Sequence, residues 1–454
     1  MKPIRSLWLA ISLVLLITSA QAETRPHYGG ALRVAIAEPL SSLDPADASN
    51  ISGETAIHKI ASLLFDTLTT LDRRGEPQPA LATSWKSDFN SQRWELQLRA
   101  GVKFSDGTAL TADSVAASLR VANPHWNVSA AGDSVVIESD TPDASLPAEL
   151  ALLQNSIALR TGGRLAGTGP FIVTQWDANK NLTLAAREDD WAGRPFIDSL
   201  EISIARLPRD EMLSLDLGKV DVIEAAAEQM VRTASTVTSA PDQLLALMFM
   251  RNAQSPEEMR LRQALSSAID RNSLNGVVLQ GTGEPAGSLL PNWMTGYGFL
   301  FSSSFNLDHA RQTRAGANQA SSWKIGYDMN DPIARVVSER IALNAQDAGL
   351  NIQPATTGVA DIKLVRISLI SSNANIALTQ LATRLQLPPP SFHGDSAESL
   401  YSAESALLQS QRVIPLLHLR TAVVLDKNVH GWNENQDGNW DLPNVWLSME
   451  KNKP

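Results

Sequence analysis

Residues 76–119, EPQPALATSWKSDFNSQRWELQLRAGVKFSDGTALTADSVAASL, indicate the local structure more clearly than any other part of the chain. Segment 94–98 alternates apolar and polar side chains, which is typical of a strand with one solvated face. Residues 105–107, Ser-Asp-Gly, have turn chemistry because glycine tolerates positive φ. Thr111 is then a helix N-cap, with Asp113 in the first turn. The stretch predicts a helix end, a turn, a strand, a second turn and a capped helix, none of them catalytic.

The same pieces, taken in order, form a long sequence signature. The residues that carry it are Pro79, Leu81, Ala82, Ser84, Trp85, Leu98, Arg99 and Gly101–Thr108. In this order they resemble the family-5 extracellular solute-binding proteins, the peptide, nickel and opine receptors of ABC importers. Further matches, in register, are Leu43–Pro45, Phe65–Asp72, Gly167–Phe171, Trp191–Ile197, Gly218–Val222, Arg262–Arg271, Val413–Leu416 and Val429–Trp432. The resemblance therefore covers nearly the whole chain.

This resemblance implies an α/β fold with mixed sheets and two lobes joined by a hinge, the periplasmic-binding-protein fold of type II (cluster C-like). The order of strand 324–327, helix 331–349 and strand 362–370 independently predicts a parallel crossover, hence an α/β lobe. Strands near Leu247–Arg251 and Val413–Leu419 are expected to cross between the lobes. The expected division is a signal peptide at 1–22, lobe I at 23–249 with a subdomain around 50–165, lobe II at 250–415, and a C-terminal return to lobe I at 416–454.

The N-terminus has the three parts of a secretory signal peptide. Lys2 and Arg5 precede the apolar run Leu7–Ile17, and residues 20–22, Ala-Gln-Ala, supply small side chains at a cleavage position. The run is shorter than the roughly 20 apolar residues that span a bilayer. The chain has no cysteine, which excludes a lipid-modified cysteine and disulfides. We expect cleavage after Ala22 and a soluble periplasmic protein that is not a lipoprotein.

The charge balance limits the partners that the protein can have. The 454 residues include 38 basic and 48 acidic side chains, a formal net charge of −10 at pH 7. An acidic chain is repelled by the phosphates of nucleic acids and by anionic lipid surfaces. We therefore expect neither nucleic-acid binding nor direct membrane insertion. Separately, we expect the protein to be a monomer.

Motifs for catalysis are missing from the sequence. It has no H-x-x-x-H pair for a metal site on a helix, no G-x-S-x-G elbow and no G-x-x-x-x-G-K-[ST] loop. Asp189 and Asp190 are adjacent, so their carboxylates point apart, and we interpret them as solvated surface. His58 lies on a predicted helix and is interpreted as a surface or satisfied histidine. We predict no catalytic residue, no metal and no cofactor.

Candidate ligand contacts follow from the resemblance, with an ordinary structural role as the alternative for each. It points to the loop after the first strand, to the segment after Val222 and to the first crossover. Tryptophans in less regular surroundings can stack on a ligand at little ordering cost. The candidate ligand-binding residues are Ser41, Asp44, Glu224, Met250, Arg251, Trp293, Arg366 and Trp432.

One element of the peptide receptors is missing. In those proteins a W-x-x-D element of the second lobe supplies the aspartate that pairs with the peptide's α-ammonium group. The segment 355–378 has no such tryptophan or aspartate, and Arg366 and Ser368 occupy roughly that place in a lobe that looks trimmed. An unpaired buried charge costs several kcal/mol, about a thousandfold in affinity. We expect free peptides to bind poorly and an anionic or neutral solute to bind better, with Arg366 as a candidate anion anchor or a solvated arginine.

The resemblance implies capture of a solute and no reaction. The protein would be the periplasmic substrate-binding component of an ABC importer, enclosing a small or peptide-like solute between its lobes. Its other partners would be the membrane permease and its ATPase subunits, contacted transiently. The alternative is a sensory or scaffolding relative with the same fold. A secreted hydrolase is disfavoured by the missing catalytic motifs.

Overall fold

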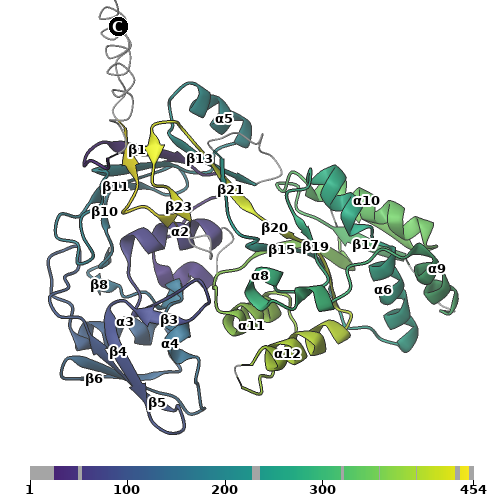
Figure 1. Ribbon diagram of the computed structural model, residues 1–454, viewed down its shortest axis with the longest axis horizontal. Helices are drawn as coiled ribbons and strands as arrows, with labels where there is room; N and C mark the ends of the chain where they lie inside the picture. Colours follow the sequence, from purple (N-terminus) through teal and green to yellow (C-terminus); the bar gives the residue numbers. More distant parts are fainter. Residues whose placement is uncertain are drawn as a thin grey trace, which may run out of the picture.

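Two mixed β-sheets, each covered by helices, divide the protein into two lobes that lie side by side (Figure 1). The structure, a computed structural model, describes residues 25–49, 54–226, 236–317, 322–356, 358–394, 396–434 and 440–448. The predicted signal peptide lies outside the described residues. We call lobe I the part built around the seven-stranded sheet and lobe II the part built around the six-stranded sheet. The predicted two-lobed α/β fold with mixed sheets is confirmed.

The signature stretch folds into strands followed by a capped helix. Its elements are β3 (Pro77–Pro79), β4 (Ala82–Ser87), β5 (Arg93–Leu98) and α3 (Ala112–Ala122). Thr111 caps α3, because its Oγ1 accepts the N–H of Ser114 at 3.2 Å and Ser114 Oγ accepts the N–H of Thr111 at 3.0 Å. The predicted helix end before β5 is wrong. That segment is β4, whose backbone pairs antiparallel with β5.

The sheet of lobe I collects strands from distant parts of the chain. β1 pairs in parallel with β12 and β13, whereas the remaining pairs are antiparallel. Leu32 and Val34 of β1 are fully buried in its core. In spatial order the strands are β10 (Phe171–Asp177), β11 (Asn181–Ala186), β12 (Ser199–Ser203), β1 (Ala31–Ala35), β13 (Val222–Ala226), β21 (Thr421–Leu425) and β14 (Thr236–Thr238).

A smaller sheet extends lobe I. Strands β4, β5, β7 and β6 form it, and α3 packs on it through Val115 and Leu119. Both residues are fully buried, which explains the apolar spacing of this helix. Other described elements of lobe I are η1 (Pro45–Ser49), α2 (Glu54–Leu64), β2 (Thr69–Leu71), β6 (Asn127–Ala131), β7 (Ser134–Glu138), α4 (Leu146–Glu149), η2 (Leu153–Asn155), β8 (Leu159–Thr161), β9 (Arg164–Ala166) and α5 (Pro208–Asp216).

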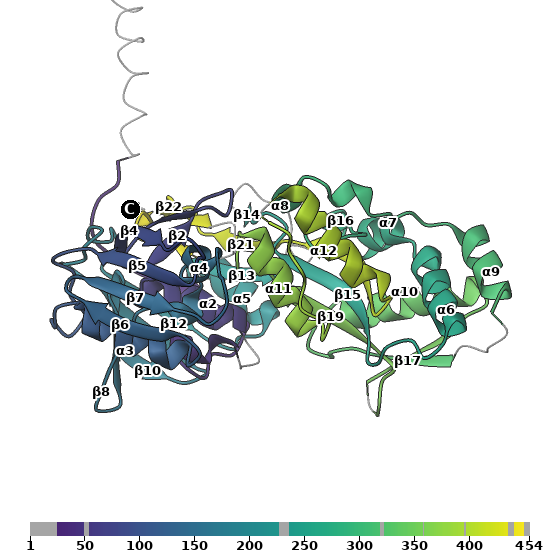
Figure 2. The ribbon, with the colours of Figure 1, turned by 90° about the horizontal axis from the view of Figure 1, so that it is seen from below.

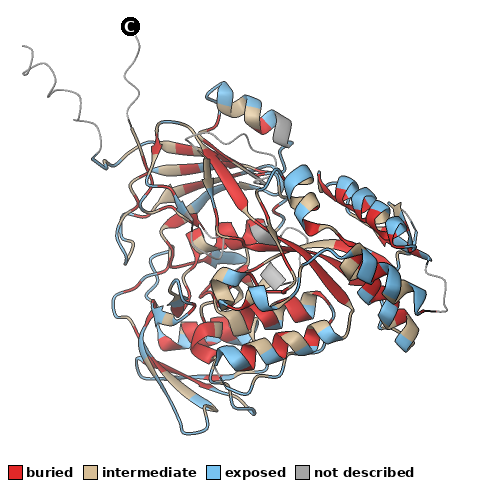
Figure 3. Cartoon of the chain, turned by 45° about the vertical axis from the view of Figure 1, so that its right-hand side comes forward, coloured by how far each residue is buried: buried red, intermediate tan, exposed pale blue. Residues whose placement is uncertain are grey.

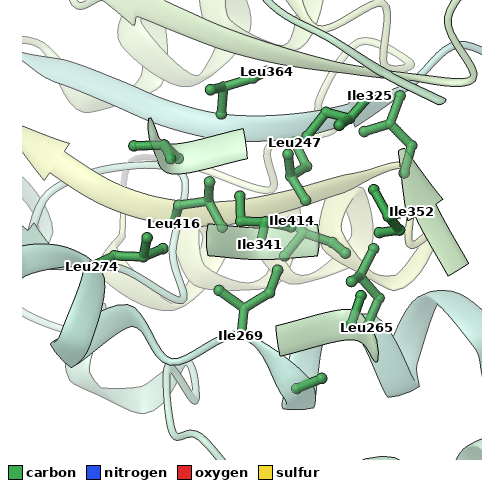
Figure 4. Close-up of a cluster of buried hydrophobic side chains, with 14 of the residues drawn as sticks. Leu247, Leu265, Ile269, Leu274, Ile325, Ile341, Ile352, Leu364, Ile414 and Leu416 are labelled. Carbon is green, nitrogen blue, oxygen red and sulfur yellow. The ribbon is translucent and has the colours of Figure 1, made fainter. Parts of the chain in front are cut away.

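Lobe II has helices on both faces of its sheet. Alternate residues of the strand β15 (Gln243–Phe249) point into the cores on opposite faces of the sheet. Leu247 packs with Leu265 and Ile341 (Figure 4), whereas Ala246 packs with Leu378. The sheet is therefore buried on both faces while the helices expose their outer sides (Figure 3). The strands, in spatial order, are β16 (Glu284–Pro285), β20 (Val413–Leu419), β15 (Gln243–Phe249), β19 (Ile362–Ser368), β17 (Ser322–Gly326) and β18 (Asn351–Ala355).

The helices of lobe II are all short. The longest described helix, α10, has 14 residues, and no described helix combines the length and apolar character needed to cross a membrane. One face of the sheet carries α6 (Pro256–Ala268), α9 (Leu307–Ala315) and α10 (Ala334–Asp347), and the other carries α11 (Ala374–Arg384) and α12 (Ala397–Gln409). Shorter elements are α7 (Arg271–Ser273), η4 (Leu274–Val278), α8 (Asn292–Thr295) and η5 (Gly298–Leu300).

The described chain passes between the two large sheets at two places. The first lies between β14 and β15, at residues 239–242, and the second lies at Arg420, between β20 and β21. The crossover expected near Leu247–Arg251 is wrong, because β15 pairs within lobe II and the chain crosses before it. The strand expected to cross near Val413–Leu419 does so, since β20 runs through Arg420 into β21 of the other sheet. A strand buried on both faces has no polar alternation, so its ends are poorly marked in the sequence.

The end of the chain lies against lobe I. Short strands β22 (Val429–His430), β23 (Asn433–Glu434), β24 (Trp440–Asp441) and β25 (Trp446–Leu447) form two small pairs. The N–H of Phe196 donates to the carbonyl of Pro443 at 3.2 Å, and Leu442 and Val445 are fully buried in the lobe I core. This segment thus places Trp440 and Asp441 beside α2.

Gly167 offers a test of the packing in lobe I. A Cβ at this position would overlap the carbonyl oxygen of Leu64 at the end of α2. We expect Gly167→Ala to lower the free energy of unfolding by about 3 kcal/mol, because neither backbone can shift cheaply. Urea denaturation followed by circular dichroism measures this. Gly276→Ala is the matched control, since a Cβ there meets open space, and equal losses in both variants would contradict the packing.

Candidate ligand-binding site between the lobes

Helix α11 forms the wall of lobe II that faces lobe I (Figures 1 and 2). Ile376, Gln380 and Arg384 follow one another at four-residue spacing, so they share one side of the helix. Ile376 packs against Ala148 and Leu152 of lobe I. At the other end of this stripe, the charge of Arg384 acts on His58 of α2. Gln380 therefore lies on this helix between a residue that packs on lobe I and a residue whose charge acts on lobe I.

A turn of lobe I rests on the start of α11. Ser372 Oγ donates to the carbonyl of Asp72 at 3.4 Å, and Asn373 Nδ2 donates to the carbonyl of Gly75 at 3.1 Å. Gly75 has φ +78°, and a Cβ there would lie 2.5 Å from the carbonyl oxygen of Ser372. The turn of residues 72–75 therefore fits only with glycine at its end. The two lobes are in contact here, and we call this arrangement of the lobes the closed form.

A cavity of about 580 Å³ lies behind this contact and takes its lining from both lobes. Lobe II contributes Ile370, Ser371 and Ser372 at the end of β19. Lobe I contributes the end of α2, the strand that follows it and the C-terminal segment. The lobe I residues of the lining are Ser62, Leu63, Phe65–Thr67, Thr70–Arg73, Pro79, Ala80, Ala151–Leu153, Pro170, Asp190–Ala192, Asn433, Trp440, Asp441 and Pro443.

Two neighbouring carboxylates characterise this cavity. Asp66 Oδ2 accepts hydrogen bonds from Thr168 Oγ1 and Trp191 Nε1, both at 2.8 Å, while burial raises the pKa of Asp66. Asp190 Oδ2 accepts the N–H of Ala192 at 3.1 Å, but its Oδ1 is shielded from solvent and has no hydrogen-bond donor. Burial, followed by the charge of Asp66, raises the pKa of Asp190 to about 6.

A second polar cluster lies where α2 approaches the first crossover. Lys59 of α2 forms a buried ion pair with Glu224 of β13. Asp242, in the crossover, is also buried, and its carboxylate accepts hydrogen bonds from Thr421 Oγ1 at 2.8 Å and from the Thr421 N–H at 3.2 Å. Burial raises the pKa of Asp242, and the Thr421 hydrogen bond and the charge of Lys59 oppose this shift. The cluster joins lobe I to the crossover.

Several buried polar atoms on the facing surfaces have no partner among the described residues. They include His58 Nε2 on α2, Gln380 Oε1 on α11 and Gln243 Oε1 at the start of β15. An unpaired buried polar atom typically costs about 1–3 kcal/mol. These three atoms therefore leave hydrogen-bonding capacity unused, although none of them belongs to the described lining of the cavity.

Comparison with known proteins identifies the family. A sequence profile of the bacterial extracellular solute-binding proteins, family 5 (middle region), matches residues 76–360, more than half of the chain. The chain belongs to this family. The resemblance predicted from the signature stretch is confirmed.

Similar proteins agree with this assignment. The "Probable D,D-dipeptide-binding periplasmic protein DdpA" of Escherichia coli is 22% identical over 330 residues, 64% of this chain and 63% of that protein. The chain therefore spans less than two thirds of this relative. Among solved structures, the ABC transporter substrate-binding protein CtaP of Listeria monocytogenes has a TM-score of 0.78 at 14% identity, covering 93% of this chain and 100% of the other. DppA of Helicobacter pylori, in complex with the peptide STSA, has a TM-score of 0.75 at 18% identity, covering 93% and 99%.

Glu224 is the predicted site residue that the structure places in the polar cluster beside the crossover. Ser41 and Asp44 lie elsewhere. They line a cavity of about 1120 Å³ whose described lining comes from lobe I alone. There Asp44 Oδ2 accepts a hydrogen bond from Arg160 Nε at 3.0 Å. The structure does not bring these two residues to the cavity between the lobes.

Met250 and Arg251 lie at the end of β15 remote from the crossover, roughly 20 Å along the strand. The Met250 N–H donates to the carbonyl of Asp361 at 2.9 Å, and Arg251 forms an ion pair with Glu258 at 2.8 Å. Their predicted place at the first crossover is therefore wrong, since that crossover precedes β15 instead of following it.

The remaining predicted residues have partners of their own. Trp293 Nε1 donates to the carbonyl of Pro241 at 2.8 Å, which fastens α8 to the first crossover. Arg366 Nε lies 3.1 Å from Asp331 Oδ2, an ion pair inside lobe II. Trp432 is 9% exposed and packs edge-on against the ring of Trp440 with centroids 5.6 Å apart. Arg366 is therefore already paired, and Trp432 is a core residue next to the cavity.

Sequence reasoning missed the residues that define the cavity. Asp189 is exposed as predicted, but the interpretation of Asp190 as solvated surface is wrong, because its Oδ1 is shielded. His58 is also buried, with Nε2 unpartnered, so its interpretation as a surface or satisfied histidine is wrong. The spacing of Gln380 and Arg384 on α11 is visible in the sequence, but a single sequence does not show that this stripe meets lobe I.

Gly75 provides a test of closure. In Gly75→Ala the added Cβ would collide with the backbone at Ser372 and Asn373, so we expect the turn to separate from α11 and the lobes to open. Small-angle scattering of the full mature chain should show a larger radius of gyration. Gly107→Ala is the control, because Gly107 has a similar φ of +86° but its Cβ would meet nothing within 4 Å. An unchanged radius in Gly75→Ala would contradict this contact.

His58 provides a pH test. Burial, and then the charge of Arg384, lower the pKa of His58 from 6.5 to about 4. The unfolded chain binds a proton there before the closed form does, so stability should fall as pH decreases from 6.5 towards 4, by up to about 1.4 kcal/mol per pH unit. The free energy of unfolding of wild type minus that of His58→Gln isolates this effect, because Asp190 and Asp242 titrate in both proteins. A difference that is independent of pH would show that His58 is solvated.

Proposed function

We propose that the protein is exported, cleaved after Ala22, and acts in the periplasm as the soluble substrate-binding component of an ABC importer. The observation that carries this proposal is the cavity of about 580 Å³ lined by both lobes behind the contact of residues 72–75 with α11. Membership of family 5 supports it. The residues of the cavity would bind a solute, and the permease would receive it from the closed form.

The mechanism is closure about a hinge. We place the hinge at residues 239–242 and at Arg420, so lobe II runs from Gln243 to Leu419 and lobe I contains the rest of the described chain. A solute stabilises the closed form only by the difference between its affinities for the closed and open forms. Ile370, Ser371 and Ser372 of lobe II supply such a difference, because they line the cavity only while lobe II rests on lobe I.

The size of the cavity favours a compact solute. Small-molecule sites typically have volumes of about 300–1,000 Å³, and this cavity lies within that range. A small molecule or a short peptide-like compound fits this space. The protein would act as a monomer, contact the permease transiently, and leave ATP hydrolysis to the ATPase subunits.

Cargo that co-purifies with the protein tests the proposal. Native mass spectrometry of protein isolated from periplasm should show the mature chain, without residues 1–22, together with a bound small molecule that is lost on unfolding and refolding. Adding small molecules from a cell extract to the refolded protein should decrease its radius of gyration. Gly75→Ala should not respond. Scattering curves that are identical with and without extract would contradict capture by closure.

A further inference from the structure

The charged groups of the cavity are unevenly distributed. Asp66, Asp72, Asp190 and Asp441 line it, against the single cation Arg73. The carboxylate of Asp72 is already used within its own turn, where Oδ1 accepts the N–H groups of Arg74 and Glu76 at 2.8 and 3.0 Å. The remaining three carboxylates all belong to lobe I. Lobe II adds only Ile370, Ser371 and Ser372 to the lining.

Asp190 is the carboxylate whose bonding is incomplete. Its Oδ1 is hidden from solvent and accepts no hydrogen bond from the described part of the chain, although the neighbouring Asp66 places a second carboxylate in the same low-dielectric surroundings. Arg187 offsets part of this charge, but its N–H groups are used by Asp189 and by the carbonyls of Thr168 and Lys103. Removing a carboxylate from water without a donor is unfavourable. A cationic group with N–H donors, placed in the cavity, would complete this site.

An independent feature of the lining calls for a ligand atom of another kind. Trp440 is 3% exposed, lines the same cavity, and its Nε1–H has no acceptor among the described residues. Buried indole N–H groups usually find an acceptor. A carbonyl or ether oxygen of a bound molecule would supply one. The cavity thus has an unused acceptor at Asp190 and an unused donor at Trp440.

We propose that the cavity binds a compact organic cation, an ammonium or guanidinium compound that also carries a hydrogen-bond acceptor, with Asp190 and Asp66 as its cation seat. The volume of about 580 Å³ is far larger than a metal ion requires, which favours an organic molecule. The expectation of an anionic or neutral solute rested on the missing aspartate of lobe II. Lobe I supplies carboxylates of its own, so this reasoning from lobe II alone does not determine the charge of the solute.

This inference rests on the proposed capture function and adds the chemical class of the solute. The test uses three amides that share one acceptor and differ at the far end of the carbon chain: ε-aminocaproamide has an ammonium group there, caproamide a methyl group and adipamate a carboxylate. Titration calorimetry on the full mature protein should give at least about tenfold tighter binding for the ammonium compound. Equal or tighter binding of caproamide or adipamate, or no detectable binding of ε-aminocaproamide, would overturn the inference.

Two variants locate the cation seat. Asp190→Asn keeps the acceptor for the Ala192 N–H and removes the charge, so it should abolish the preference for ε-aminocaproamide. Asp189→Asn is the matched control, because Asp189 is adjacent but exposed and pairs with Arg187. This variant should keep the preference for ε-aminocaproamide.

Because burial and Asp66 raise the pKa of Asp190 to about 6, binding of ε-aminocaproamide near that pH should release a proton in wild type and not in Asp190→Asn. Titrations in buffers of different ionisation enthalpy measure this proton, and the same proton release in both proteins would exclude Asp190.

A fractionated extract separates failure of this inference from failure of the proposed function. Small molecules from periplasm are divided by ion exchange into cationic, neutral and anionic fractions, and each is added to refolded protein. An increase in the midpoint of thermal unfolding with the cationic fraction alone supports the inference. An increase with the neutral or anionic fraction alone overturns the inference but leaves capture intact. No increase with any fraction overturns both.

Discussion

The two places where the backbone passes between the lobes constrain the rest of the structure. Thr421, just after the second crossover, is bonded to the first: its N–H is shared between Ser239 Oγ at 3.0 Å and the Asp242 carboxylate at 3.2 Å, and its Oγ1 donates to the same carboxylate. These bonds hold both crossings together inside a buried region. Lobe movement is therefore confined to rotation about a few residues, as in other hinge closures. Every contact between the lobes far from this point depends on that rotation.

The contacts that form on closure are few and incompletely satisfied. The turn of residues 72–75 and Ile376 connect the lobes, whereas His58, Gln380 and Gln243 have polar atoms without partners among the described residues. A closed form that satisfied all of its own groups would not need a solute. A receptor that must reopen requires open and closed forms that differ by only a few kcal/mol, with the solute supplying the balance. The unused hydrogen-bonding capacity is consistent with this requirement.

The sequence predicted the fold better than the site. The signature stretch, the cap at Thr111 and the strand–helix–strand order of lobe II depend on local turn, cap and periodicity rules, which act within a few residues. The first crossover was misplaced because β15 is buried on both faces and carries no alternation to mark its ends. Asp190 and Trp440 are 250 residues apart in sequence and line one cavity only because the C-terminal segment returns to lobe I, which no local pattern encodes. The resemblance also pointed to Glu224, which the structure places in an ion pair with Lys59, and its role as a ligand contact stays a prediction.

The two lobes would contribute differently to solute binding, because the carboxylates of the cavity all belong to lobe I. The carboxylates and Trp440 all belong to lobe I, and Trp191 holds Asp66 in place through its indole N–H. A cation can therefore bind to lobe I while the cleft is open, before lobe II has moved. Closure would then add Ile370–Ser372 and lower the local dielectric, which would strengthen the proposed ion pair. Recognition of charge would thus precede closure, and the fit of the remaining molecule against β19 and α11 would decide whether the lobes stay closed.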